Sequence, residues 1–267
     1  MNGGGRIAAA FGKARAENRA AMIPFITAGY PAADSTVPML TALAESGADI
    51  IELGVPFSDP SADGPAIARA SEKALANGIT LQKILQQIGA FRQTDKKTPV
   101  VLMGYANSFF RCGREKFMTA AKQNGADGLI VVDFSDDERP LWRKAGQAAG
   151  VDVISLVAPT TSPERQMQLA GESAGFVYFI ALKGITGAHH LSVDALAPRI
   201  GELKKAAKTP VAVGFGIRDA AQARQLAKCA DGIVVGSRLT EVIEESPKQD
   251  AAKNVAAVVG ELAGAVR

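Results

Sequence analysis

The sequence predicts a (β/α)8 barrel, in which eight parallel strands form a closed ring inside a ring of helices. Three observations support this fold class. Short apolar runs rich in Val, Ile and Leu alternate with longer stretches whose apolar residues recur at helical spacing. Each pattern occurs eight times, and no linker or change in composition divides the 267 residues. A doubly wound open sheet is the alternative, but eight repeats of the unit favour closure.

The expected strands are continuous apolar runs, which is typical of parallel strands covered on both faces. In chain order they are Ala21–Thr27, Ile50–Gly54, Pro99–Met103, Gly128–Val132, Val151–Val157, Phe176–Ile180, Pro210–Gly214 and Gly232–Val235.

The expected helices lie between and after these strands. They are Val37–Glu45, Leu81–Phe91, Arg114–Gln123, Arg139–Ala149, Glu164–Ala170, Asp194–Lys205, Ala220–Lys228 and Asn254–Ala263. Gly47, Gly125 and Gly150 each follow such a helix, which is typical of C-terminal caps. We also expect short extra helices near the termini and in the loop after the eighth strand. Residues 1–267 should form a single domain, with residues 1–5 as a flexible tail.

Composition excludes several classes of protein. The formal net charge is +3, and the basic residues are scattered, so no nucleic-acid surface is indicated. Two distant cysteines, Cys112 and Cys229, cannot supply a disulfide framework or a thiolate metal site. No apolar stretch approaches the roughly 18 residues of a membrane span, and the N-terminus lacks the apolar run of a signal peptide. We therefore expect a cytoplasmic protein that binds neither membrane nor nucleic acid.

Glu52 interrupts the second apolar run, at the end of the barrel where barrel enzymes carry their chemistry. Period-2 alternation places Glu52 on one face with Ile50 and Gly54, opposite Ile51 and Leu53. If the latter pair packs against helices, Glu52 points into the barrel mouth, where loss of solvation raises its pKa toward a value useful for proton transfer. The alternative is a structural ion pair with a Lys or Arg of the barrel.

Asp63 closes the loop that follows the second strand. Asp-Gly-Pro is a good entry to a helix beginning near Pro65, so turn chemistry alone explains a lone Asp at this point. The long preceding loop is not needed merely to join a strand to a helix, which favours a functional role.

Three glycine-bearing segments follow the last three strands, namely Gly184–Gly187, Gly214–Gly216 and Gly236-Ser237. Glycine lets backbone N–H groups approach an anion closely, and a short helix at Ser237–Glu245 would direct its positive end toward a phosphate. Barrel phosphate sites use the loops after strands seven and eight with such a helix. The segments therefore predict a phosphate site.

Three runs give the sequence its resemblance to the α subunits of tryptophan synthase. They are Glu52–Pro60 continued by Ala62–Pro65, Pro24–Pro31 and Leu102–Asn107. The resemblance extends from about Arg6 to the C-terminus. It implies a (β/α)8-barrel lyase that splits indole-3-glycerol phosphate into indole and glyceraldehyde 3-phosphate, with no cofactor and no metal in this chain.

The resemblance also implies roles for individual residues. Glu52 and Asp63 match the catalytic pair, and Tyr178 matches an active-site tyrosine, although a strand tyrosine is more often a core residue with one hydrogen bond. Residues matching the phosphate segments are Gly187, Phe215, Gly216, Gly236 and Ser237. Thr186, in a lid at Ala181–His190, matches a residue that contacts the catalytic Asp. The indole slot would be lined by Phe25, Met103, Ile130, Val132 and Val157, each of which ordinary barrel packing also explains.

A partner is implied as well, a pyridoxal-phosphate β subunit in an α2β2 complex. The matching interface positions are Pro56, Ser58, Asp59, Pro60 and Asn107. The sequence departs from the family pattern at Ala181, at Phe134–Asp137 and at His189-His190. Two adjacent histidines on one loop lack the further ligands that a metal site needs.

Three other functions compete with this interpretation. A barrel that only binds and activates a β subunit has no need of buried acids. Another phosphate-binding barrel, such as an isomerase or aldolase, is the second alternative. A Schiff-base aldolase would want a lysine inside a strand, whereas Lys183 falls just beyond the sixth run. A stand-alone indole-releasing lyase would share every residue discussed.

Overall fold

The structure is a computed structural model, and it describes residues 5–180 and 193–267, apart from the side chain of Asp194. Its strands run parallel in the order β5-β4-β3-β2-β1-β9-β8-β7-β6. They are β1 Ala21–Thr27, β2 Ile51–Gly54, β3 Val100–Gly104, β4 Gly128–Val131, β5 Asp152–Val153, β6 Ser155–Val157, β7 Val177–Ile180, β8 Val211–Gly214 and β9 Gly232–Val235. The predicted barrel is confirmed. Except in the fifth predicted strand, each strand begins and ends within one residue of its predicted bounds.

The fifth predicted strand is divided at Ile154. Its first part, β5, pairs with β4, and its second part, β6, pairs with β7. The N–H of Ile154 still donates to the carbonyl of Leu129 at 2.9 Å, whereas the N–H of Ser155 donates to Ser173 Oγ at 2.8 Å. The chain therefore passes from one neighbour to the other within this strand, which nearly closes the ring.

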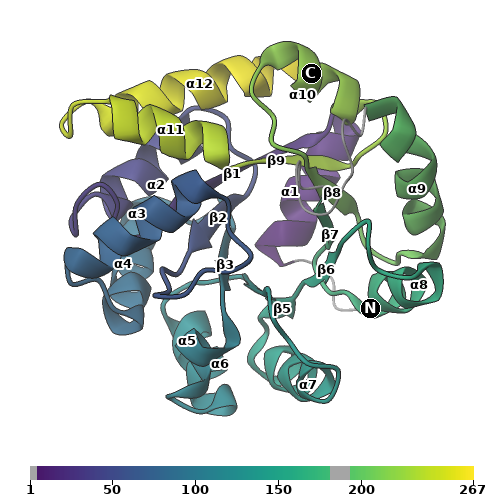
Figure 1. The fold of residues 1–267 in the computed structure, drawn as a ribbon, viewed down its shortest axis with the longest axis horizontal. Helices are drawn as coiled ribbons and strands as arrows, with labels where there is room; N and C mark the ends of the chain where they lie inside the picture. The colour runs from purple at the N-terminus through teal and green to yellow at the C-terminus, as the bar shows by residue number, and fades with distance from the viewer. Residues whose placement is uncertain (1–4, 181–192) are drawn as a thin grey trace.

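Helices surround the strands on all sides (Figure 1). They are α1 Arg6–Ala16, α2 Thr36–Glu45, α3 Pro65–Ala76, α4 Leu81–Thr94, α5 Ala106–Phe110, α6 Arg114–Gln123, α7 Glu138–Ala149, α8 Pro163–Glu172, α9 Val193–Ala206, α10 Ala220–Ala227, α11 Ser237–Glu245 and α12 Ala251–Ala265. The three predicted capping glycines, Gly47, Gly125 and Gly150, adopt positive φ angles of 103°, 90° and 74°. An L side chain rarely adopts such angles, which explains why these helices end there.

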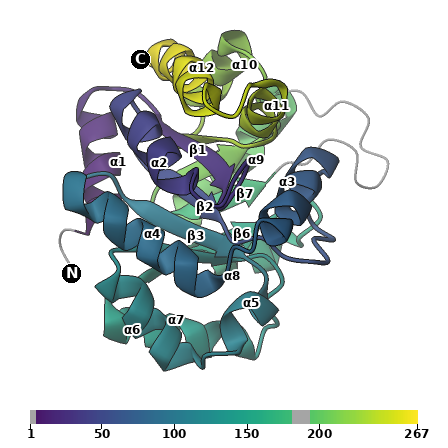
Figure 2. The same cartoon turned by 90° about the vertical axis from the view of Figure 1, so that its left-hand side faces the viewer.

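The core has two layers, one between strands and helices and one inside the barrel. The inner layer includes Ile7 and Phe11 of α1, which contact the barrel at Gly128 and Gly232, where two strands begin. Helix α1 therefore covers the N-terminal end of the barrel, and α3 lies at the opposite end (Figure 2). Within the described ranges, no helix is long and apolar enough to span a membrane.

Candidate active site

Glu52 points into the barrel from β2, as its alternation predicts. Ile50 belongs to the inner layer, whereas Ile51 and Leu53 belong to the layer under the helices. The Glu52 side chain is 1% exposed, and neither carboxylate oxygen has a hydrogen-bond partner among the described residues. Burial, and then the charge of Asp63, raise the pKa of Glu52 to about 8. No described residue forms the structural ion pair considered as the alternative.

Asp63 is held by the loop that leads from β2 to α3. Its N–H donates to the carbonyl of Pro60 at 3.0 Å. The Tyr105 hydroxyl accepts the N–H of Ala62 at 2.9 Å and bonds the Asp63 carboxyl. Burial raises the pKa of Asp63 to about 6, against the hydrogen bond from Tyr105, which lowers it. Gly64, not Asp63, occupies the N-cap of α3, so turn chemistry does not account for this carboxylate.

Tyr178 faces the barrel interior from β7, beside Leu156 of β6 in register. Its ring lies so close to Gly214 that a Cβ built there would fall 2.7 Å from the tyrosine hydroxyl. Burial, and then the charge of Glu52, raise the pKa of Tyr178 well above its usual range. Its hydroxyl therefore stays protonated and neutral at neutral pH, and it lies close enough to Glu52 for the Glu52 charge to affect its pKa.

A small cavity lies beside these groups at the C-terminal end of the strands. Its lining includes Phe25, Met103 and Val132 of the predicted slot together with Asp63 and Tyr105. The cavity measures about 20 Å³, room for about one water molecule. The Phe25 ring fills the space above Gly54 and Gly236. A Cβ atom built on Gly54 would lie 2.6 Å from Cζ of Phe25, and one built on Gly236 would lie 3.3 Å from Cδ1 of the same ring. An indole ring therefore needs movement of this wall to enter.

One residue predicted for the slot is misplaced. Val157 belongs to the outer layer of the core, between the strands and the helices, so its side chain is turned away from the barrel interior. Its neighbour Leu156 packs against the inner layer and is partly exposed there. The structure therefore contradicts the placement of Val157 in a slot inside the barrel, and Leu156 is the residue of this strand that faces the interior. Ile130 does belong to the inner layer, although it does not line the small cavity.

Two of the three predicted phosphate segments, Gly214–Gly216 and Gly236-Ser237, lie at the ends of the neighbouring strands β8 and β9. Helix α11 begins at Ser237, as predicted, and its first backbone bond within the helix runs from Thr240 N to Gly236 O at 3.0 Å. The N–H groups of residues 237–239 precede that bond and have no acceptor within the helix. Phe215 is buried, and Gly216 has a φ of 61°. Thr186 and Gly187 lie outside the described residues.

The predicted partner positions differ in exposure. Ser58, Asp59 and Asn107 are exposed, Pro60 is partly exposed, and Pro56 is buried within the chain. Inward from these positions, the Phe57 ring stacks on Tyr105 at 4.9 Å between centroids.

Sequence reasoning missed two residues of this site. Tyr105 follows the third strand, and its position at a C-terminal strand end was the available signal. Thr27, the last residue of β1, lines the cavity and is 3% exposed. Its hydroxyl has no hydrogen-bond partner among the described residues, which makes it an available donor or acceptor in the cavity wall.

Two carboxyl groups whose pKa values are raised toward neutrality, at the C-terminal end of a parallel barrel, define an acid–base enzyme of the TIM-barrel class. Among the described residues, no group of three or more His, Cys, Asp or Glu side chains is placed to hold a metal ion.

Comparison with known proteins identifies the family. Residues 11–267 match the model of the tryptophan synthase alpha chain family. The tryptophan synthase alpha chain of Dechloromonas aromatica is 52% identical over 257 residues, which cover 96% of each chain. That of an Azoarcus species is 51% identical over 250 residues, covering 94% of this chain and 92% of the relative.

Comparison with solved structures leads to the same family. The crystal structure of tryptophan synthase subunit alpha from Legionella pneumophila superposes with a TM-score of 0.91 at 37% identity, covering 98% of both chains. A structure of Mycobacterium tuberculosis tryptophan synthase gives 0.89 at 40% identity, again covering 98% of both chains. The chain belongs to the tryptophan synthase alpha chain family. It is a lyase of tryptophan biosynthesis that cleaves indole-3-glycerol phosphate to indole.

Proposed function

We propose that Glu52 is the general acid and base of this cleavage, with Asp63 as the ionised partner of the indole N–H. The observation that carries the proposal is the contrast between their pKa values. With a pKa of about 8, Glu52 is mostly protonated at pH 7, whereas Asp63, at about 6, is mostly ionised. One carboxyl group can therefore donate a proton while the other accepts a hydrogen bond.

The retro-aldol step then balances without an external acid. Glu52 donates its proton to C3 of the indole ring, and Asp63 stabilises the positive charge that develops on the ring nitrogen. The resulting Glu52 carboxylate takes the proton of the glycerol hydroxyl next to C3. The bond between C3 and the side chain breaks, its electron pair returns to the ring, and the hydroxyl carbon becomes the aldehyde of glyceraldehyde 3-phosphate.

Tyr178 is a positioning residue in this proposal. Its hydroxyl keeps its proton and lies beside Glu52, so it is a donor that can orient the carboxyl group or the glycerol chain. The substrate phosphate would bind at the N-terminus of α11, with Gly187, Phe215, Gly216, Gly236 and Ser237 around it. The indole would displace the Phe25 ring and lie among Met103, Ile130, Val132 and Leu156, with Thr186 closing over Asp63.

The proposed partner is a tryptophan synthase β subunit in an α2β2 complex, and pyridoxal phosphate would belong to that partner alone. Exposed Ser58, Asp59 and Asn107 offer polar contacts on the same end of the barrel as the acids. The stack of Phe57 on Tyr105, and the bond from Tyr105 to Asp63, give docking on this loop a physical route to the catalytic carboxylate. The two free cysteines fit a reducing, cytoplasmic location.

Indole release from indole-3-glycerol phosphate tests the proposal, with and without a β subunit. Slow release that rises strongly with the partner supports an activated α subunit, whereas equal release in both conditions indicates a stand-alone lyase. Glu52→Gln and Asp63→Asn should each lower kcat by about a hundredfold to ten-thousandfold, which is the usual contribution of acid–base catalysis. Near-normal turnover by a folded Glu52→Gln variant would refute the role of Glu52.

A further inference from the structure

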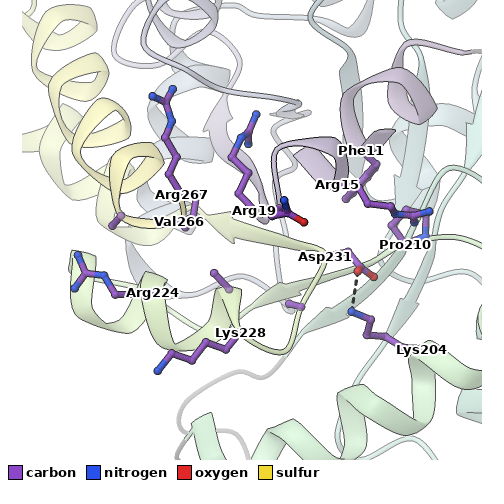
Figure 3. A pocket seen from close by; sticks show the side chains of 14 residues that line it. Phe11, Arg15, Arg19, Lys204, Pro210, Arg224, Lys228, Asp231, Val266 and Arg267 are labelled. Carbon is purple, nitrogen blue, oxygen red and sulfur yellow. Dashed lines mark ion pairs between the residues drawn. The ribbon is translucent and has the colours of Figure 1, made fainter. Parts of the chain in front are cut away.

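A second and larger pocket lies at the opposite end of the barrel (Figure 3). It measures about 510 Å³, within the range of small-molecule sites. Its wall is formed by the end of α1, the segments just before β8 and β9, the end of α10 and the residues after α12. None of the residues assigned to the cleavage reaction lines it.

The side chains around this pocket are mostly basic. Its lining contains the six basic residues Arg15, Arg19, Lys204, Arg224, Lys228 and Arg267, and a single acidic one, Asp231. The whole chain has a net charge of only +3, so positive charge is concentrated here. Concentrated charge of one sign in a concave surface raises the local concentration of ions of the opposite sign.

Two of these cations are already neutralised. Lys204 Nζ lies 2.7 Å from Asp231 Oδ1, and the other oxygen of that carboxylate accepts the N–H of Val211 at 2.8 Å. The Arg19 guanidinium binds both oxygens of Asp49, at 2.6 and 2.7 Å, and also Glu17 at 2.7 Å. These groups hold the wall together and are not available to a ligand.

The other four cations, Arg15, Arg224, Lys228 and Arg267, form no ion pair within residues 5–180 and 193–267. Helix dipoles offer a simpler explanation for some of them, because Arg15 and Arg224 lie in the last turns of α1 and α10, and Lys228 caps α10. A helix C-terminus carries about half a negative charge. The C-terminal end of α12 also lies at the pocket, and three helix ends cannot balance four full positive charges, so an excess remains.

The arrangement of these cations indicates the class of ligand. Figure 3 shows Arg15 and Arg224 on opposite sides of the pocket, with Lys228 and Arg267 at its edge. Guanidinium groups bind phosphate in a bidentate manner. Because these cations are spread around the edge of the pocket, a ligand with several anionic groups can contact more of them than a ligand with one. The wall between them is mixed, with the apolar side chains of Phe11, Pro210 and Val266 beside polar ones such as Asn18. We propose that this pocket binds a small polyanion that carries two or more phosphate groups.

Calorimetric titration of the whole chain with tripolyphosphate, ATP and inorganic phosphate tests this proposal. We expect saturable binding of tripolyphosphate and ATP, weaker binding of inorganic phosphate, and loss of affinity as ionic strength rises. Tighter binding of ATP than of tripolyphosphate would show that the apolar side chains of the wall add to the affinity. The reverse order would indicate that the ligand is an inorganic oligophosphate.

A matched pair of variants locates the binding. Arg224→Ala/Lys228→Ala removes one arginine and one lysine from the pocket, and Arg111→Ala/Lys116→Ala removes the same two charges from an exposed surface elsewhere. The pocket variant should bind tripolyphosphate about five- to tenfold more weakly, from two contacts of surface ion-pair strength, and the control should bind normally. An equal loss in both variants would mean a general charge effect. Unchanged affinity in the pocket variant would mean that the ligand does not bind at these two side chains. Either result, or no saturable binding at all, would overturn the proposal.

Discussion

At the N-terminal end of the barrel, the Asp127 carboxylate accepts Arg6 Nη1 at 2.7 Å, Arg92 Nη2 at 2.9 Å and the N–H of Val100 at 3.0 Å. At the C-terminal end, Glu52 is buried more completely, and neither of its oxygens has a described partner. The first carboxylate is satisfied and ties α1, α4 and two strands together. The second is left unsatisfied, so its proton is retained near neutral pH. The carboxylate at the N-terminal end of the barrel therefore stabilises the fold, whereas the one at the C-terminal end lowers stability and is kept for its chemistry.

The same substitution, acid to amide, should have opposite effects at the two ends. Asp127→Asn removes the charge that pairs with both Arg6 and Arg92, and it leaves a largely buried guanidinium without its nearest counter-ion. Breaking a buried ion pair from one side typically costs about 3–5 kcal/mol of unfolding free energy. Urea unfolding at pH 7 measures this loss. A loss below about 1 kcal/mol would show that Asp95 and the carbonyls around Arg92 compensate, and that the N-terminal end does not depend on this pair.

Glu52→Gln should instead stabilise the protein as pH rises. The folded-state pKa of Glu52 is about 8, against 4.5 for the free side chain. Between those values the folded state binds more protons than the unfolded state, so wild-type stability falls with rising pH across this window. The glutamine does not titrate, so the unfolding free energy of the variant should exceed that of the wild type by a few kcal/mol near pH 8. Unfolding curves of both proteins at pH 5 and pH 8 give the difference, and a constant gap would contradict the raised pKa.

Most of the fold could be predicted from sequence, because buried parallel strands are continuous apolar runs and helix ends are marked by glycine. The break at Ile154 could not be, since Val151–Val157 is apolar throughout apart from Asp152 and Ser155. Val157 was assigned to the slot by resemblance, and a run that is apolar on both faces gave no pattern that would show that Leu156 faces inward. Glu52 was predictable because one acid in an apolar strand is conspicuous. Helix α5, with only five residues, was too short to show a period.

The role of Tyr105 was also beyond sequence reasoning, because it depends on contacts across the barrel mouth. Tyr105 bonds Ala62 and Asp63, more than forty positions earlier in the chain, and only the closed ring brings them together. Local sequence patterns predict the strands and helices. The electrostatics of the site instead depend on segments that are distant in the sequence and lie together at one end of the barrel.

The two carboxyl groups at the C-terminal end should produce a bell-shaped dependence of kcat/KM on pH. Activity needs Glu52 protonated and Asp63 ionised, so it should fall above a pKa of about 8 and below one of about 6. The two limbs belong to the interacting pair, because the charge of Asp63 contributes to the raised pKa of Glu52. Initial rates of indole release between pH 5 and 9 test this, and a flat profile across pH 6 would show that Asp63 need not be ionised.

Tyr105→Phe should shift only the acidic limb of that profile. The hydroxyl lowers the pKa of Asp63, so its removal should move the acidic limb toward neutral pH while the alkaline limb stays in place. A hydrogen bond to a charged group is worth about 1.5–3 kcal/mol, which corresponds to a shift of about one to two pKa units at most. Phe57→Leu is the matched control, because it removes the ring stacked on Tyr105 and keeps the hydroxyl. If both variants moved the limb equally, packing of the loop rather than the hydrogen bond would set the pKa of Asp63. If only Tyr105→Phe moved it, a residue outside the acid pair would tune the chemistry of this end of the barrel.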